Sequence, residues 1–171
     1  HKSIDTYFPD TKLAITEYSY GGANHISGGI AQADALGIFG KEKVFFASKW
    51  YDISDYLVSA YDLYLDANGK GLKFPNKGLK VHYKDYKNGS LYAAQDELKN
   101  IHLIILNKNQ DDSLGINLNL DGSIDYDRYE SFGFWNGQKD LIAGPKGNMK
   151  QNELNIQVRP LSVYNVVLYH K

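Results

Sequence analysis

Residues 12–50 have the sequence KLAITEYSYGGANHISGGIAQADALGIFGKEKVFFASKW, and they carry the clearest indication of the fold. The first part, Lys12–Tyr18, is a short apolar run typical of a buried strand. A glycine-rich loop comes next, and then a helix is expected from Ile26 to Phe39, with Asn24 as its candidate N-cap. The apolar run in Val44–Trp50 predicts a second strand, buried on both faces. Strand, helix and strand in this order imply parallel strands joined by a right-handed crossover.

A second helix is expected from Ser54 to Ala67, where tyrosine and leucine recur at helical spacing. In the first helix, small residues at Gly29, Ala33 and Gly37 share one face, so the backbone there can approach a sheet closely. Two strand–helix units supply only two parallel strands, which cannot close a barrel. The pattern therefore predicts the end of a larger α/β domain, and the alternative is a small βαβα module packed on the C-terminal strands.

Turn and breaker residues after position 67 mark a change to strands alone. Asparagine–glycine and aspartate–glycine pairs separate the later strands, as in hairpins. Several antiparallel strands at short spacing predict a β-sandwich over residues 80–171. The expected strands are Val81–Tyr86, Ser90–Gln95, Ile101–Asn107, Gly115–Leu120, Tyr129–Trp135, Leu154–Val158 and Ser162–Tyr169.

The amino-acid composition excludes several classes of function. The chain has a formal net charge of -1, so it offers no general attraction to nucleic acid or to an anionic membrane surface. It holds no cysteine and no apolar run long enough to span a bilayer. No motif points to a cofactor, and the spacing of Asp121, Asp125 and Asp127 does not match the EF-hand pattern. The 14 Tyr, 7 Phe and 2 Trp suit both sheet packing and sugar-binding surfaces.

Glu17 is the candidate catalytic residue. It lies at the C-terminal end of the first expected strand, and catalytic residues of α/β barrels occupy that end. Tyr18 and Tyr20 are close in sequence, and their hydroxyls could orient a carboxylate and keep it ionised. Trp50 ends the next strand in the same way, where its ring could stack on a sugar. His25 begins the following helix, so it either touches substrate or orders the loop.

The run from Ile15 to Gly22, continued by residues 24–34 and 36–40, closely resembles glycoside hydrolase family 44, which contains endoglucanases and xyloglucanases. Ile101–Asn109 is similar to the sandwich domain of that family. The resemblance implies a (β/α)8 TIM barrel with an attached β-sandwich. Residues 1–79 would be the last two βα units of the catalytic barrel, and residues 80–171 the sandwich.

The resemblance also implies a function. Glu17 would be the nucleophile of a retaining, endo-acting β-1,4-glucanase, and Trp50, Tyr18, Tyr20 and His25 would bind substrate. The acid/base glutamate belongs to the fourth barrel strand of the family, which this chain does not contain. The expected partners are a β-glucan polysaccharide and the missing N-terminal part of the barrel, and the expected location is extracellular. The alternative is a non-catalytic carbohydrate-binding or structural sandwich module.

Overall fold

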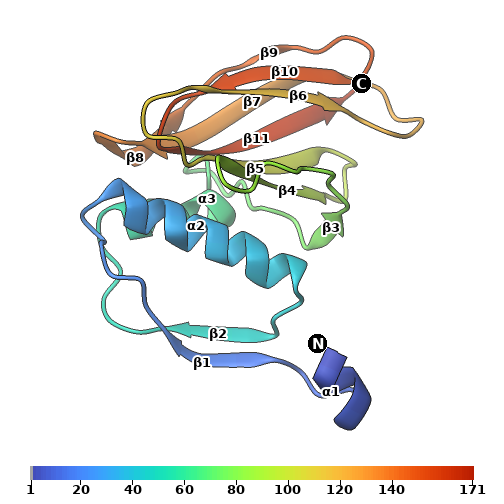
Figure 1. Cartoon of the computed structure of the whole chain (residues 1–171). Coiled ribbons are helices and arrows are strands. Elements are labelled where there is room, and N and C mark those ends of the chain that lie inside the picture. The colour runs from blue at the N-terminus through green and yellow to red at the C-terminus, as the bar shows by residue number, and fades with distance from the viewer. Residues whose placement is uncertain (1) are drawn as a thin grey trace.

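The computed structural model describes residues 2–171, and Figure 1 shows its elements in layers. A pair of strands, β1 and β2, lies under the helices α2 and α3, which cover one face of a large central sheet. The strands β6 and β10 cover its other face. The helices are α1 (Lys2–Tyr7), α2 (Ile26–Lys41) and α3 (Tyr56–Leu65). The strands are β1 (Ala14–Tyr18), β2 (Phe46–Lys49), β3 (Lys77–Leu79), β4 (Gly89–Gln95), β5 (Ile101–Asn107), β6 (Leu114–Asn119), β7 (Tyr126–Trp135), β8 (Gln138–Ala143), β9 (Gly147–Asn148), β10 (Glu153–Val158) and β11 (Ser162–His170).

The strands β1 and β2 are parallel neighbours, which confirms the predicted pairing. The expectation that they are buried was wrong, because neither strand holds a buried residue and one face of the pair is uncovered. Ala14 pairs with Phe46, Ile15 with Ala47 and Tyr18 with Lys49. One residue of β2 therefore faces two residues of β1, and this irregularity is a β-bulge. Residues paired across neighbouring strands share a face, so the bulge lets Ile15 and Tyr18 point the same way although they are three positions apart.

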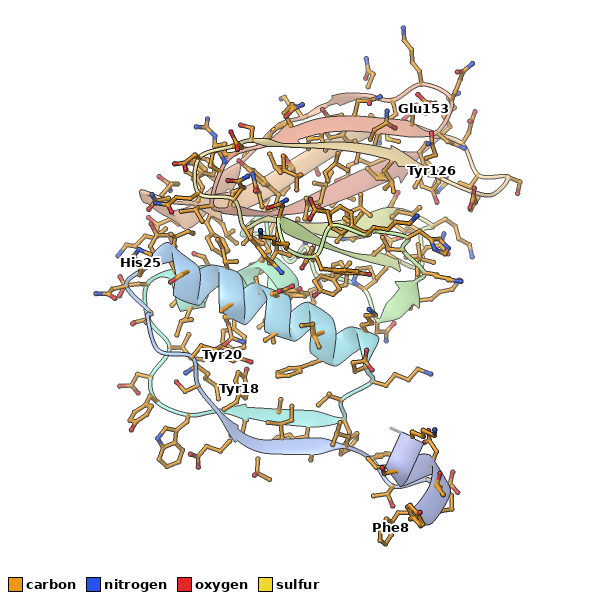
Figure 2. All side chains as sticks on the ribbon, viewed as in Figure 1. Phe8, Tyr18, Tyr20, His25, Tyr126 and Glu153 are labelled. Carbon is orange, nitrogen blue, oxygen red and sulfur yellow. The ribbon has the colours of Figure 1, made fainter. Side chains whose placement is uncertain are left out.

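The helix α2 follows the prediction closely but differs at both ends. Its N-cap is His25 rather than Asn24, and it continues beyond Gly40 to Lys41. His25 has extended backbone angles and its ring accepts a hydrogen bond from the Ser27 N–H, which satisfies one free donor of the first turn. Figure 2 shows His25 where the loop enters the helix.

The central sheet has the strand order β3-β4-β5-β11-β7-β8, with β9 also paired to β7. Every pairing in it is antiparallel. All seven residues of β5 are buried, because both faces of this strand are covered. On one face Ile104 and Leu106 join the core made with α2 and α3. On the other face Leu103 and Ile105 join a second core, roofed by β6 and β10.

The sheet-rich part is antiparallel throughout and consists of two facing sheets, consistent with the predicted sandwich. Two details of the prediction were wrong. Val81–Tyr86 is not a strand, and the edge strand β3 lies earlier, at residues 77–79. The strands β8 and β9 were not predicted, because residues 138–143 show no clean alternation of apolar and polar side chains. None of the helices within residues 2–171 is long and apolar enough to cross a bilayer.

Candidate functional site at the carboxyl ends of β1 and β2

The carboxyl ends of β1 and β2 are held side by side. The Trp50 N–H donates to the Tyr18 carbonyl over 2.8 Å, which extends the parallel pairing one residue past β2. The Lys49 ammonium also links the two strand ends. It donates to the Ser19 hydroxyl over 3.1 Å and to the Trp50 carbonyl over 2.6 Å. Glu17 and Trp50 therefore lie at the same edge of the pair.

Glu17 occupies the bulge of β1, and its side chain is exposed. Bulges often occur next to active sites, where they re-aim one side chain. Within residues 2–171 the carboxylate makes no hydrogen bond or ion pair of its own. A carboxylate at this edge is thus open to a molecule arriving from outside.

Tyr18 anchors the strand end from the helix side. Its hydroxyl lies 2.8 Å from the Tyr61 hydroxyl of α3 and accepts a hydrogen bond from the Gln32 amide of α2 over 3.0 Å. Its ring packs edge-on against Phe39, with centroids 5.3 Å apart. Gln32 is fully buried. Burial and the hydrogen bond to Tyr18 raise the pKa of Tyr61 well above its usual value, so the Tyr61 hydroxyl keeps its proton.

This network was not foreseen from the sequence. Gln32 and Tyr61 lie 14 and 43 residues from Tyr18. The only sequence signal was a polar residue, Gln32, in the middle of an otherwise apolar helical face. The Tyr18 hydroxyl binds Tyr61 and Gln32, so it holds the backbone next to Glu17 in place. It does not orient the Glu17 carboxylate, which corrects the expectation from the sequence.

Tyr20 lies beside Tyr18, with ring centroids 5.6 Å apart, and Figure 2 shows both rings between β1 and α2. It is 49% exposed, and partial burial raises the pKa of its hydroxyl. His25 is placed further along the loop. Its Nδ1 contacts the Ser27 hydroxyl at 2.8 Å, so the ring helps to order the start of α2.

Trp50 is 50% exposed and does not stand alone. The ring of Tyr51, 78% exposed, meets it edge-to-face with centroids 5.7 Å apart. Tyr51 has a φ of 69°, in the left-handed region where bulky residues are rare. Two large rings thus form an exposed aromatic corner at the strand edge that also holds Glu17, and only the first of them was predicted.

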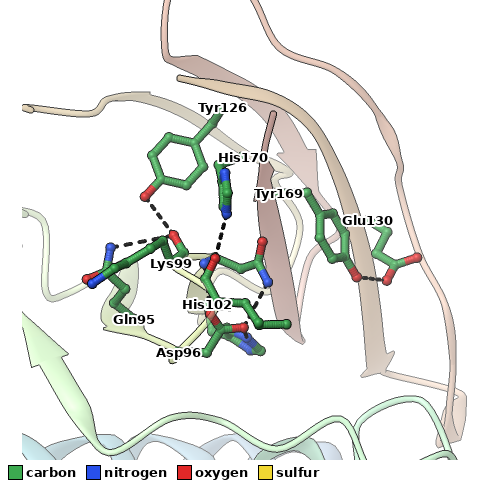
Figure 3. A network of polar contacts seen from close by, with 10 residues as sticks. Gln95, Asp96, Lys99, His102, Tyr126, Glu130, Tyr169 and His170 are labelled. Atoms are coloured by element: carbon green, nitrogen blue, oxygen red, sulfur yellow. Dashed lines mark hydrogen bonds and ion pairs between the residues drawn. The ribbon is translucent and has the colours of Figure 1, made fainter. Parts of the chain in front are cut away.

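A second polar cluster lies in the sheet-rich part (Figure 3). The Asp96 carboxylate accepts two hydrogen bonds from Asn100 and lies 3.4 Å from Nε2 of His102. The Tyr126 hydroxyl donates to the Lys99 carbonyl over 2.9 Å. His102 is 2% exposed, and burial lowers its pKa, although Asp96 partly opposes this. These contacts tie the β4–β5 turn to β7 and bury the imidazole, so the cluster serves structure.

Comparisons with known proteins relate this geometry to a family. The chain is 43% identical over 171 residues to endoglucanase A of Paenibacillus lautus. It is 41% identical over 159 residues to the β-mannanase/endoglucanase A of Caldicellulosiruptor saccharolyticus. These alignments cover 97% and 91% of this chain but only 24% and 12% of the two relatives. The chain therefore spans about a quarter or less of the curated relatives that it matches.

Solved structures agree. The family 44 endoglucanase of Clostridium thermocellum superposes with a TM-score of 0.93 at 40% identity. A family 44 xyloglucanase of Paenibacillus polymyxa, solved with xyloglucan, superposes with a TM-score of 0.93 at 35% identity. Both superpositions cover 98% of this chain and 34% of the solved one. No family model matches the chain. In sequence and in fold, this chain is thus related to the glycoside hydrolases of family 44.

Proposed function

We propose that this chain is the C-terminal portion of a longer, retaining glycoside hydrolase that cuts β-1,4-glucans of the cellulose or xyloglucan type. The names of its relatives support activity on glucans. The observation that carries the proposal is the carboxyl edge of the parallel pair β1–β2, which holds both the exposed Glu17 and the aromatic corner of Trp50 and Tyr51.

The incomplete appearance of the β1–β2 pair supports the longer protein. Parallel strands are normally covered on both faces. Here Tyr18 packs on the helices, while Ala14 and Phe46 on the opposite face are exposed, Phe46 by 53%. We infer that β1 and β2 are the last two strands of a (β/α)8 barrel and that the later residues form the β-sandwich. The expected boundary after residue 79 moves to before Lys77, because β3 already pairs with β4. The other barrel strands would close over the exposed face.

In this mechanism the Glu17 carboxylate attacks the anomeric carbon of a bound β-linked sugar, and the glycosidic C–O bond breaks. The leaving oxygen takes a proton from an acid carboxyl in the preceding part of the barrel. That group then removes a proton from water, which attacks the anomeric carbon and frees Glu17. The two carboxyls of a retaining enzyme stand about 5–5.5 Å apart. An unpaired carboxylate in a bulge suits the attacking role, because no partner has to be displaced.

The other predicted site residues take supporting roles. Trp50 and Tyr51 would stack on the apolar face of a sugar ring. Tyr20, whose side chain is about half exposed, would hydrogen-bond substrate, and Tyr18 would hold the strand end through Gln32 and Tyr61. His25 would contact substrate from the loop while capping α2. As enzymes that degrade an insoluble polymer act outside the cell, the whole protein would be secreted. A non-catalytic carbohydrate-binding module is the rival, and it has no use for Glu17.

The test uses the longer protein that contains this chain. We expect Glu17→Gln to lower turnover by several orders of magnitude while substrate binding survives, because only the attacking charge is lost. The matched control is Glu153→Gln, an exposed strand glutamate on β10 that should leave turnover unchanged.

Trp50→Ala should act differently and mainly raise KM, because stacking contributes equally to ground state and transition state. Mass spectrometry after reaction with a fluorinated glucoside should find the sugar on the peptide that holds Glu17. An adduct on another carboxylate, or near-normal turnover of Glu17→Gln, would refute the assignment.

A further inference from the structure

One segment of the chain is strongly basic. Residues 70–87 hold six lysines and one acidic residue, Asp85, whereas the whole chain balances 19 basic against 20 acidic side chains. All six lysines are exposed: Lys70, Lys73, Lys77, Lys80, Lys84 and Lys87. The near-zero net charge of the chain therefore conceals a local excess of positive charge.

From Lys77 onward this segment runs along the free edge of the central sheet, outside β4 (Figure 1). Lys77 pairs with Gln95 at one end of β4. At the other end the Lys108 N–H donates to the Asn88 carbonyl, directly after Lys87. The segment thus follows the seven residues of β4, a length of about 20 Å at roughly 3.3 Å per residue. Lys80, Lys84 and Lys87 are at most four residues apart, or roughly 13 Å along an extended chain, so their fields overlap at low ionic strength, where the Debye length is about 30 Å at 0.01 M.

These charges are not neutralised within the molecule. None of the six lysines forms an ion pair among residues 2–171. The Asp85 carboxylate is engaged by Asn88, which donates its side-chain amide over 2.8 Å. Asp96 and Glu97 line a shared pocket with Lys73 and Lys77. The positive charge is therefore least offset by carboxylates in the later part of the segment, at Lys80, Lys84 and Lys87.

An open aromatic ring lies at that end. Tyr86 is 57% exposed. The Tyr83 ring supports it edge-on, with centroids 6.0 Å apart at 87°. The Lys41 ammonium, from the end of α2, lies 5.8 Å from the centroid of Tyr86. An exposed ring provides a face for a sugar, and the ammonium groups around it provide partners for an anion.

We propose that this lysine edge, defined as Lys80, Lys84, Lys87, Tyr86 and Lys41, binds a linear acidic polysaccharide whose sugars carry carboxylates, that is, a polyuronate. Exposed cations repeated along one sheet edge match a linear polymer with repeated anions. The edge contains lysine and no arginine, so it lacks the planar fork that favours phosphate. The site is separate from Glu17 and does not depend on the proposed catalysis.

The experiment measures binding of the full-length protein to polygalacturonate and to neutral hydroxyethylcellulose, by affinity electrophoresis at low and high salt. The test variant carries Lys80→Gln, Lys84→Gln and Lys87→Gln. We expect it to bind polygalacturonate about tenfold more weakly, the loss expected from three exposed ion pairs. Tyr86→Ala should weaken binding several-fold at either salt concentration.

The charge-matched control carries Lys2→Gln, Lys146→Gln and Lys150→Gln, which lie elsewhere on the surface. Equal weakening by this control would overturn the proposal, because net charge alone would then explain binding. Tighter binding to single-stranded DNA than to polygalacturonate would point to a different class of ligand and overturn it as well. If the test variant binds normally but self-associates, the proposal is wrong and the lysines only protect the sheet edge from pairing.

Discussion

A close approach between a helix and the central sheet gives a quantitative test. A Cβ atom at Gly29 in α2 would lie 2.8 Å from Cβ of Tyr56 and 2.9 Å from Cε2 of Phe134. Both neighbours are buried, so neither can move away freely. Gly40 in the same helix has no heavy atom within 4 Å of its would-be Cβ. The two glycines thus share a helix but differ in packing.

This difference in packing sets the expected change in the free energy of unfolding when each glycine is replaced by alanine. Replacing glycine by alanine in a helix gains up to about 1 kcal/mol from backbone propensity. Overpacking a core costs about 1–3 kcal/mol. We therefore expect Gly29→Ala to lower the free energy of unfolding by about 1–2 kcal/mol, where packing outweighs propensity. Gly40→Ala should raise the free energy of unfolding by up to about 1 kcal/mol.

Urea unfolding followed by tryptophan fluorescence would measure both variants. Trp135 is suited as the probe because its ring stacks on Tyr164 in the core, with centroids 6.0 Å apart. The urea midpoint should shift in opposite directions while the slope stays constant, since the surface exposed on unfolding is unchanged. If both variants shift the urea midpoint equally in the same direction, the close packing of Gly29 on Tyr56 and Phe134 does not decide the stability of the contact between α2 and the central sheet.

Three further outcomes are expected. Tyr61→Phe in the longer enzyme should lower both stability and kcat, because it breaks the contact with Tyr18. Tyr64→Phe loses a 2.8 Å hydrogen bond to the Ala33 carbonyl and should lower stability alone. Equal kcat for both variants would exclude a role for Tyr61 at the site. The 171-residue chain by itself should release no reducing sugar from soluble cellulose derivatives, and release above a blank would contradict the two-carboxyl scheme. Because burial lowers the pKa of His102, its neutral form favours folding above its unfolded pKa of about 6.5. Stability should thus fall as the pH drops below that value, and His102→Asn should flatten this pH dependence between pH 7 and 5 in urea titrations.

Much of the fold could be predicted because strong local patterns coincide with buried faces. β5 was predicted to the residue, since a continuous apolar run bounded by turns is typical of a doubly covered strand. Val81–Tyr86 shows the limit of such patterns. Val81 and Tyr83 are partly buried and His82 is exposed, as the alternation implied. Periodicity reports side-chain burial, however, and does not report whether the backbone finds a strand to pair with.

The candidate site was also predictable only in part. The positions of Glu17 and Trp50 at one edge followed from two apolar strands that each end in a functional residue type. The N-cap could not be chosen from sequence, because Asn24 and His25 are both able to cap. The tight turn in which the His25 N–H donates to the Gly22 carbonyl decides it. The contacts of Gln32 and Tyr61 arise only when two helices pack together, which no local pattern encodes.

The strands β5 and β11 are covered on both faces, and this limits where the chain can be joined to a related protein in a chimera. β5 and β11 send alternate side chains into two cores, and the Asn165 amide of β11 donates to the Leu63 carbonyl of α3 over 2.9 Å. A splice near residue 79 would separate Ile104, Leu106 and Phe134 from the helices that bury them. Chimeras that keep α2 and α3 with the sheets, joined ahead of β1, should fold, whereas those that exchange the sheets alone should require a redesigned helix face.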